Sequence, residues 1–214
     1  MEWKDVPEVW QECFNEAWKS YQGGSRPIGA LVTDREGVII ARGKSAVFIS
    51  LTDSILSNNE LAHAEINALL QLDNRVHTIR NTYTLLSTME PCPLCFGAFY
   101  MSGIRNLKYA ARDNWAGSAN LQDASPYMSL KPIQVEGPFS SLEQLSLVLN
   151  MYFELMIRSG ASSKVTQCWT ESHPDEAALA AQWFKMKTLE RNTDLTIGDV
   201  FTMLQNEMKL SSIK

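Results

Sequence analysis

Two short motifs in the chain contain the residue types that bind a catalytic metal ion. HAE occupies residues 63–65, and PCPLC occupies residues 91–95. One imidazole nitrogen and two thiolate sulfurs suit Zn²⁺, and three protein ligands leave the fourth tetrahedral position open to water. His63, Cys92 and Cys95 are therefore the candidate ligands of a catalytic zinc ion.

Glu65 is the candidate proton carrier, because it is close in sequence to a ligand but is not needed to complete the ligand set. Residues two apart in a helix point to nearly opposite sides, so His63 and Glu65 converge only if His63 stands at the very start of a helix. Cys92 and Cys95 are expected on one face of a helix start, where exposed N–H groups favour thiolates. Alone, this cysteine pair also fits a redox pair or half of a structural zinc site. The two motifs together favour the catalytic interpretation.

Hydrophobic spacing predicts the elements that must position these motifs. Apolar residues recur every three or four positions from residue 6 to residue 21, which predicts a helix that Gly23 and Gly24 end. Residues 28–33 and 38–41 predict a β-hairpin. The remaining expected elements are helices at 61–72 and 91–101 and strands at 82–87, 107–111 and, more weakly, 133–136. This order predicts an α/β fold with a mixed sheet covered by helices.

The C-terminal part of the chain is expected to be helical. Ser140 and Glu143 have the spacing of a capping box for a helix that runs to about residue 159. Residues 159–164 are expected to form a linker, and further helices are expected at 174–189 and 199–209. We therefore predict a zinc domain over residues 1–159 and a helical appendage over residues 160–214.

Composition excludes several classes of protein. The chain has 214 residues, of which 45% are hydrophobic and 20% charged, so it can bury a substantial core and is not mainly disordered. It has no apolar run long enough for a membrane span and no signal-like N-terminus, which predicts a cytoplasmic protein. Four cysteines are too few for a disulfide framework. The formal net charge of −5 and the lack of a basic run disfavour general nucleic-acid binding.

The sequence resembles the zinc-dependent cytidine deaminase superfamily over roughly residues 6–120, through HAEINAL, TMEPCPLC, FGAFYMSGI and ARDNWAGS. It is most similar to the branch of bacterial tRNA adenosine deaminases and guanine or cytosine deaminases. The resemblance implies a three-layer α/β/α fold with a five-stranded mixed sheet, extended here by the C-terminal helices. It also implies Zn²⁺ on His63, Cys92 and Cys95, Glu65 as the proton shuttle, the backbone of Cys92 on the oxyanion side, and a homo-oligomer, such as a dimer.

Four residues are expected to contact the substrate: Ser45, Ala64, Phe96 and Trp115. Ser45 stands where the branch usually has an asparagine, and a hydroxyl lacks the paired donor and acceptor of an amide. Phe96 follows the second cysteine where a small residue is common, so it either narrows the pocket or offers a stacking face. Trp115 follows a strand, where it either stacks on a base or serves as ordinary packing.

Three functions are consistent with these observations. The first is hydrolytic deamination of a free nucleobase, nucleoside or nucleotide, with a ring amine exchanged for a carbonyl and ammonia released; the acidic charge balance favours it. The second is deamination of the wobble adenosine of tRNA, for which Arg105, Lys108 and Arg112 form only a modest basic cluster. The third is a non-catalytic scaffold that keeps zinc structurally, for which an unliganded Glu65 would have no use.

Overall fold

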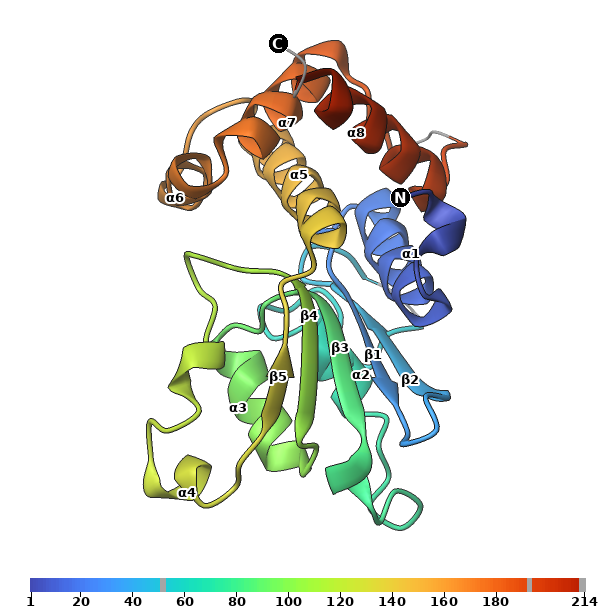
Figure 1. Cartoon of the computed structure of the whole chain (residues 1–214), viewed down its shortest axis with the longest axis vertical. Helices are drawn as coiled ribbons and strands as arrows, with labels where there is room; N and C mark the ends of the chain where they lie inside the picture. Colours follow the sequence, from blue (N-terminus) through green and yellow to red (C-terminus); the bar gives the residue numbers. More distant parts are fainter. Residues whose placement is uncertain (51–52, 192–193, 212–214) are drawn as a thin grey trace.

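The computed structural model describes residues 1–50, 53–191 and 194–211, and a five-stranded sheet lies at its centre (Figure 1). The strand order is β2-β1-β3-β4-β5. β1 pairs antiparallel with β2 and β3, whereas β4 pairs parallel with β3 and β5, so the sheet is mixed. The strands are β1 (Gly29–Thr33), β2 (Ile39–Lys44), β3 (Thr84–Met89), β4 (Asn106–Ala111) and β5 (Gln134–Glu136).

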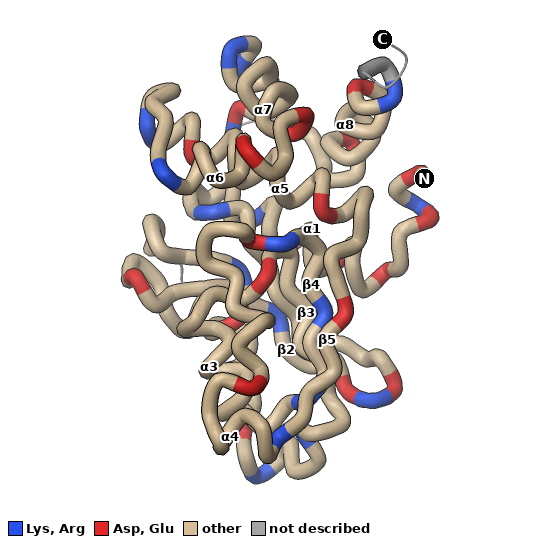
Figure 2. Tube along the Cα trace, turned by 60° about the vertical axis from the view of Figure 1, so that its left-hand side comes forward, with Lys and Arg blue, Asp and Glu red and all other residues tan. Residues whose placement is uncertain are grey.

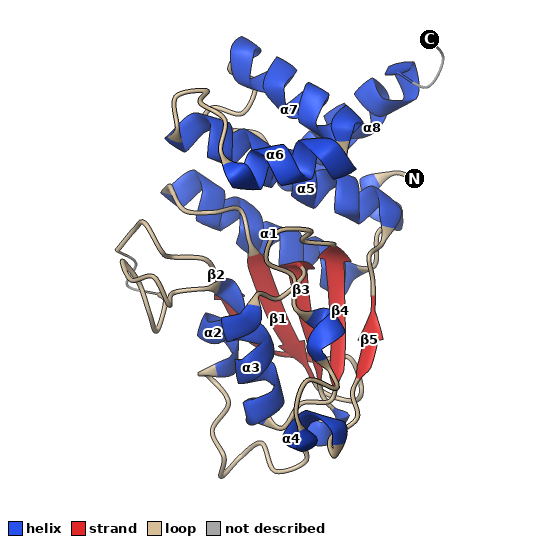
Figure 3. Cartoon of the chain, turned by 90° about the vertical axis from the view of Figure 1, so that its left-hand side faces the viewer, coloured by secondary structure: helices blue, strands red, loops and turns tan. Residues whose placement is uncertain are grey.

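Helices cover both faces of this sheet. Successive strand residues point to opposite sides, so neighbouring apolar residues of a strand are buried under helices on different faces. Leu31 belongs to an apolar cluster with residues of α1 (Glu8–Gly23) and α5 (Ser140–Ile157). Its neighbour Val32 belongs to a second cluster with residues of α2 (Ala64–Leu69) and α3 (Pro93–Ser102). The predicted three-layer α/β/α architecture with a mixed five-stranded sheet is confirmed (Figure 3).

Three further helices lie beyond α5, on the side of the molecule away from β5 and α4 (Pro126–Ser129) (Figure 1). They are α6 (Lys164–Ser172), α7 (Pro174–Met186) and α8 (Ile197–Ser211). Trp169, Trp183 and Phe201 share one apolar cluster with α1 and α5. The C-terminal helices therefore extend the core on that face of the sheet, while the domain division at residue 160 stays a prediction.

One local expectation for the C-terminal half is wrong, and one helix was missed. Helix α5 begins after Phe139, with no side-chain cap from Ser140, and the Glu143 carboxylate instead accepts the backbone N–H of Arg112 at 3.1 Å. Helix α6 was not predicted at all. Its capping box joins Ser163 to Thr166, a pair outside the usual Ser/Thr with Glu/Gln pattern.

Within the described part of the chain, no helix is both long and apolar enough to cross a membrane.

Candidate active site

Helix α2 places His63 and Glu65 on the same side of the site. His63 is the N-cap of α2, with extended backbone angles (φ −75°, ψ 153°), and so stands just before the helical turn that contains Glu65. The two side chains therefore do not point in opposite directions, as the side chains of residues two apart do within a helix. The predicted condition for their convergence, that His63 stands at the very start of a helix, is met.

Helix α3 places the two cysteines beside His63. Cys92 is the N-cap of α3, Pro93 occupies the first helical turn, and Cys95 lies one turn further along. Proline suits this position because the N–H that it lacks has no partner within the helix. Residues three apart lie on one face of a helix, so both sulfurs point the same way.

The spacing of the three side chains fits a single zinc ion. The ligand atoms of His63, Cys92 and Cys95 all lie within 4.8 Å of one another. Nδ1 of His63 is 3.6 Å from Sγ of Cys92 and 3.4 Å from Sγ of Cys95. A tetrahedral ion with bonds of about 2.0–2.3 Å would keep its ligand atoms roughly 3.3–3.8 Å apart. The donor set therefore matches Zn²⁺ in both chemistry and spacing.

Glu65 lies beside this donor set without belonging to it. Its carboxylate accepts a hydrogen bond from Oγ of Ser87 at 2.8 Å, and Oε2 lies 3.3 Å from Sγ of Cys95. Only 4% of Glu65 is exposed. Burial raises the pKa of Glu65, because the charged form loses its hydration. A carboxyl group with a raised pKa holds a proton more readily than an exposed one, which suits a group that must both accept and donate a proton.

The thiols and the imidazole are electrostatically coupled. The hydrogen bond from the neighbouring Cys95 thiol is the largest of the effects that lower the pKa of Cys92 to about 4. Hydrogen bonds from His63 and from the backbone N–H of Cys95 also lower this pKa, whereas burial raises it. Cys92 in turn raises the pKa of Cys95, and burial adds to that effect. The hydrogen bond with Cys92 also raises the pKa of His63. Cys92 is therefore the first of the two thiols to become a thiolate, the form that binds metal.

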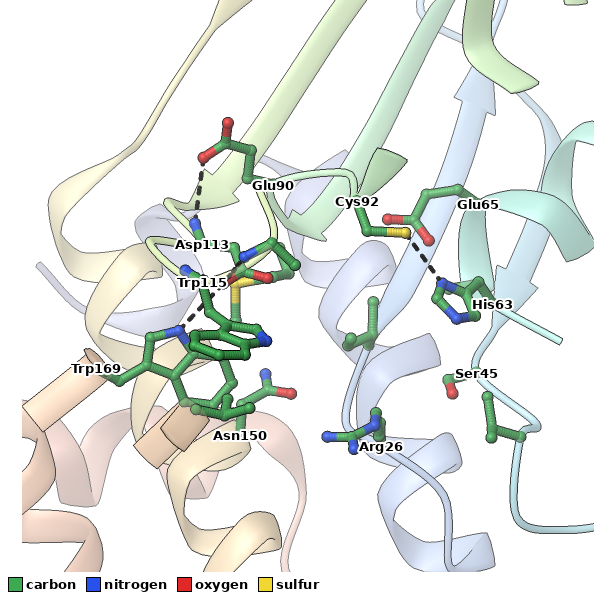
Figure 4. A pocket seen from close by; sticks show the side chains of 16 residues that line it. Arg26, Ser45, His63, Glu65, Glu90, Cys92, Asp113, Trp115, Asn150 and Trp169 are labelled. Carbon is green, nitrogen blue, oxygen red and sulfur yellow. Dashed lines mark hydrogen bonds between the residues drawn. The ribbon is translucent and has the colours of Figure 1, made fainter. Parts of the chain in front are cut away.

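A cavity of about 220 Å³ opens beside these side chains. Its walls come from segments far apart in the sequence. These are the segment before β1, the segment after β2, the start of α2, the turn after β3, the loop after β4, and helices α5 and α6. The lining residues include Arg26, Ser45, Ala64, Glu90, Asp113, Trp115, Asn150 and Trp169 as well as His63, Glu65 and Cys92 (Figure 4).

Three of the four expected substrate contacts line this cavity: Ser45, Ala64 and Trp115. The Ser45 hydroxyl lies 3.2 Å from that of Ser25, so another side chain already engages it. The expectation for Phe96 is wrong. Phe96 is 1% exposed and packs against Phe99 and Tyr100 in the apolar cluster beneath α2 and α3. Its position next to Cys95 turns it about 100° around the helix, away from the metal-binding face.

The sequence did not single out five polar or aromatic residues of the cavity wall: Arg26, Glu90, Asp113, Asn150 and Trp169. Glu90 immediately precedes the PCPLC motif, and its carboxylate oxygens accept the backbone N–H groups of Asp113 and Ala119 at 3.2 and 3.0 Å. Arg26 pairs with the buried carboxylate of Glu154, and its guanidinium lies 5.6 Å from the ring centre of Phe48. Asn150 lies on α5 and Trp169 on α6. Glu90 lies within TMEPCPLC and Asp113 within ARDNWAGS, so these two residues offered a sequence signal.

Comparison with known proteins gives one family. Residues 4–111 match the family model described as the cytidine and deoxycytidylate deaminase zinc-binding region. Guanine deaminase of Bacillus subtilis is 31% identical over 118 residues, which are 50% of this chain and 65% of that protein. A tRNA-specific adenosine deaminase of Streptococcus pyogenes is 33% identical over 111 residues, which are 51% of this chain and 65% of that protein. The chain thus spans about 65% of the length of these relatives.

Solved structures show the same fold. The structure of guanine deaminase from Nitrosomonas europaea superimposes with a TM-score of 0.50 at 24% sequence identity, covering 69% of this chain and 84% of that one. At this identity the likeness concerns the fold alone. It agrees with the arrangement of sheet and helices described above.

Proposed function

Because the chain belongs to the family of the cytidine and deoxycytidylate deaminase zinc-binding region, we propose that it is a zinc-dependent hydrolytic deaminase of a nucleobase, nucleoside or nucleotide. The observation that carries the proposal is the place of Glu65. This buried carboxyl group lines the cavity, lies 3.3 Å from a candidate ligand sulfur and is not one of the three clustered donors. A purely structural zinc site has no need of such a group.

The proposed reaction consumes one water molecule and releases one molecule of ammonia. Zn²⁺ held by His63, Cys92 and Cys95 would supply a water molecule whose pKa is lowered towards 7. Glu65 takes a proton as the water oxygen bonds to the ring carbon that carries the amine, and delivers it to the adjacent ring nitrogen. Glu65 then transfers the second proton to the amine, the C–N bond breaks, and a carbonyl remains. Ser87 holds the carboxyl group in place through its 2.8 Å hydrogen bond.

The charge distribution favours a small substrate over a polynucleotide. Lys and Arg total 19 against 24 Asp and Glu. Figure 2 shows basic and acidic positions interspersed along the described trace, with no continuous basic stripe. Tight binding of a polynucleotide depends on several phosphate contacts from Lys and Arg. A free base or nucleoside needs only the cavity.

Deamination of the wobble adenosine of tRNA is the second candidate, because the Streptococcus pyogenes relative that is 33% identical is named a tRNA-specific adenosine deaminase. Two members of the expected basic cluster are already engaged. Lys108 pairs with Glu136 at 2.9 Å, and the Arg105 guanidinium donates to the carbonyl of Ile104 at 2.5 Å. The ion pair offsets the charge of Lys108, and the hydrogen bond occupies one of the Arg105 donors, so both residues offer less to a phosphate.

Ammonia release and zinc content together test the proposal. Wild type, Glu65→Gln and the exposed control Glu60→Gln are compared on cytosine, guanine, adenine, their nucleosides and nucleotides, and a tRNA anticodon stem. We expect turnover by the wild type and the control, and a loss of about 10²–10⁴-fold in kcat for Glu65→Gln with bound zinc retained. Full zinc with no turnover of any substrate by the wild type would refute the enzyme and favour the scaffold. Turnover that Glu65→Gln leaves unchanged would refute the proposed proton carrier.

A further inference from the structure

Helix α6 contributes one wall of the cavity that contains the proposed catalytic residues. Val165 and Trp169 lie one turn apart on this helix, so both face the same way, and both line the cavity. The helix lies well outside residues 4–111, which match the family model. The wall is therefore built by the C-terminal part of this chain.

Trp169 ties α6 to the loop that follows β4. Its indole Nε1–H donates to Oδ1 of Asp113 at 3.2 Å, and the side chain is only 4% exposed. The same carboxylate oxygen accepts the backbone N–H groups of Trp115 and Ala116 at 2.9 and 3.1 Å. Asp113 thus fixes the backbone of Trp115 on one side and the indole of Trp169 on the other.

Glu90 ties the same loop to the cysteine motif. Its carboxylate holds the backbone N–H groups of Asp113 and Ala119, and it is separated from Cys92 only by Pro91. Gly117 makes this approach possible, because a Cβ atom there would lie 2.4 Å from the Glu90 carboxylate. Helix α6, the loop and the start of α3 therefore form one connected frame around the cavity.

Trp115 is the member of this frame that is free to contact a ligand. It lines the cavity while 51% of its surface is exposed. Figure 4 shows its indole beside that of Trp169, across the cavity from His63 and Glu65. A planar ring held between the two sides would expose its edge to Glu65 and its face to Trp115. Stacking of a base on an aromatic side chain contributes about 1–3 kcal/mol.

The size of the cavity limits what can occupy it. Its volume of about 220 Å³ is below the roughly 300–1,000 Å³ typical of sites for drug-sized ligands. A nucleotide flipped out of a polynucleotide would also have to carry its neighbours past the rim. Residues 160–214, which include α6, carry no excess of basic residues to hold those phosphates.

From these contacts, and resting on the proposed function, we infer that Trp169 is a positioning residue for Trp115, and that this frame restricts the substrate to a free heteroaromatic amine. Trp115 stacks on the ring, and Trp169 holds Trp115 through the shared Asp113 carboxylate. The substrate class is a free nucleobase or its nucleoside, and not a residue within RNA.

Trp169→Phe tests the positioning role, because it keeps an aromatic ring and removes the indole donor together with part of the ring volume. Trp183→Phe is the matched control, since Trp183 is also buried, at 2% exposure, but lies on α7 outside the cavity wall. We expect Trp169→Phe to raise the KM for the best free substrate about tenfold or more, with kcat changed less than about threefold, because a hydrogen bond to a charged group is lost. Trp183→Phe should leave KM unchanged. Equal KM values for the two variants would overturn the positioning role.

Two further measurements test the substrate class separately from catalysis. In the wild type, kcat/KM for the anticodon stem should be at least 10²-fold below that for the best free substrate; an equal or higher value would overturn the restriction. Deaminated bases such as hypoxanthine, xanthine and uracil serve as equilibrium probes that need no turnover. At least one should bind to the wild type in equilibrium dialysis, and Trp115→Leu should weaken that binding about tenfold or more. If Trp115→Leu leaves binding intact, the stacking role is refuted, whether or not the protein catalyses the proposed reaction. If binding depends on Trp115 but no substrate is turned over, only the proposed function is refuted.

Discussion

Replacing Gly43 by alanine should displace the helix that carries His63 and Glu65. A Cβ atom at Gly43 would lie 2.0 Å from the carbonyl oxygen of Ala64 and 2.6 Å from the backbone nitrogen of Ala68. Ordinary contact begins at 3.4 Å, so α2 and β2 must separate by about 1.4 Å. Backbone atoms cannot rotate away as a flexible side chain can. Because Ala64 stands between His63 and Glu65, the displacement moves both residues relative to the cysteines on α3.

The size of this displacement sets the expected losses. Forcing an extra methyl group into a packed core typically costs about 1–3 kcal/mol of unfolding free energy. A misplacement of about 1 Å in a catalytic group can cost 10²-fold in rate. We therefore expect Gly43→Ala to lose about 1–3 kcal/mol of stability and at least about 10²-fold in kcat/KM. Urea denaturation and ammonia release measure the two effects.

Gly97→Ala is the matched control for this substitution. Gly97 lies within α3, and a Cβ atom there would meet nothing within 4 Å. Alanine inside a helix is favoured over glycine by about 0.5–1 kcal/mol, so this variant should be slightly more stable and equally active. If Gly43→Ala matched the wild type in both stability and kcat/KM, the reasoning that the close approach of β2 positions α2 would be refuted.

Two further predictions concern the groups around the cavity. Glu154→Gln should lower the unfolding free energy at pH 7 by about 1–3 kcal/mol, because the buried carboxylate pairs with Arg26 and Arg158, both partly exposed. Although burial opposes them, these arginines lower the pKa of Glu154 from its usual 4.5. The ionised Glu154 therefore stabilises the folded protein above pH 4.5, and this stabilisation is lost as the pH falls through the lower pKa of the folded state. Urea titrations should therefore show a steeper acid loss of stability for the wild type than for Glu154→Gln, and parallel curves would count against the ion pair. Gly117→Ala should raise KM, because its Cβ atom would lie 2.4 Å from the Glu90 carboxylate and disrupt the loop that holds Trp115; an unchanged KM would show that the loop tolerates the displacement.

The fold was largely predictable from local patterns. The apolar spacing of α1 and the β-branched runs of β1 and β2 reflect which side chains face the core, and those patterns are visible in sequence. The relation between His63 and Glu65 was also predictable, because only the start of a helix brings residues two apart together. Helix α6 was not predictable in this way. Its cap uses Thr166 in place of Glu or Gln, and its buried residues Thr166 and Trp169 are too few to set a clear period.

The rest of the cavity wall depends on contacts between segments far apart in sequence. Trp169 and Asp113 are 56 residues apart, and Arg26 and Glu154 are 128 residues apart, so no local pattern links either pair. The error for Phe96 has a related cause. Proximity in sequence to Cys95 suggested proximity to the substrate, but each residue of a helix turns by about 100°, and that rotation directs Phe96 into the core.

Zinc K-edge X-ray absorption of the purified protein tests the central claim most directly. The claim is that one imidazole and two thiolates bind a single ion while the Glu65 carboxylate stays outside the ligand set. It predicts one zinc per chain with two sulfur neighbours at about 2.3 Å and two lighter neighbours at about 2.0–2.1 Å, unchanged in Glu65→Gln. Four sulfur or four protein ligands, or a spectrum that loses one light neighbour in Glu65→Gln, would contradict it.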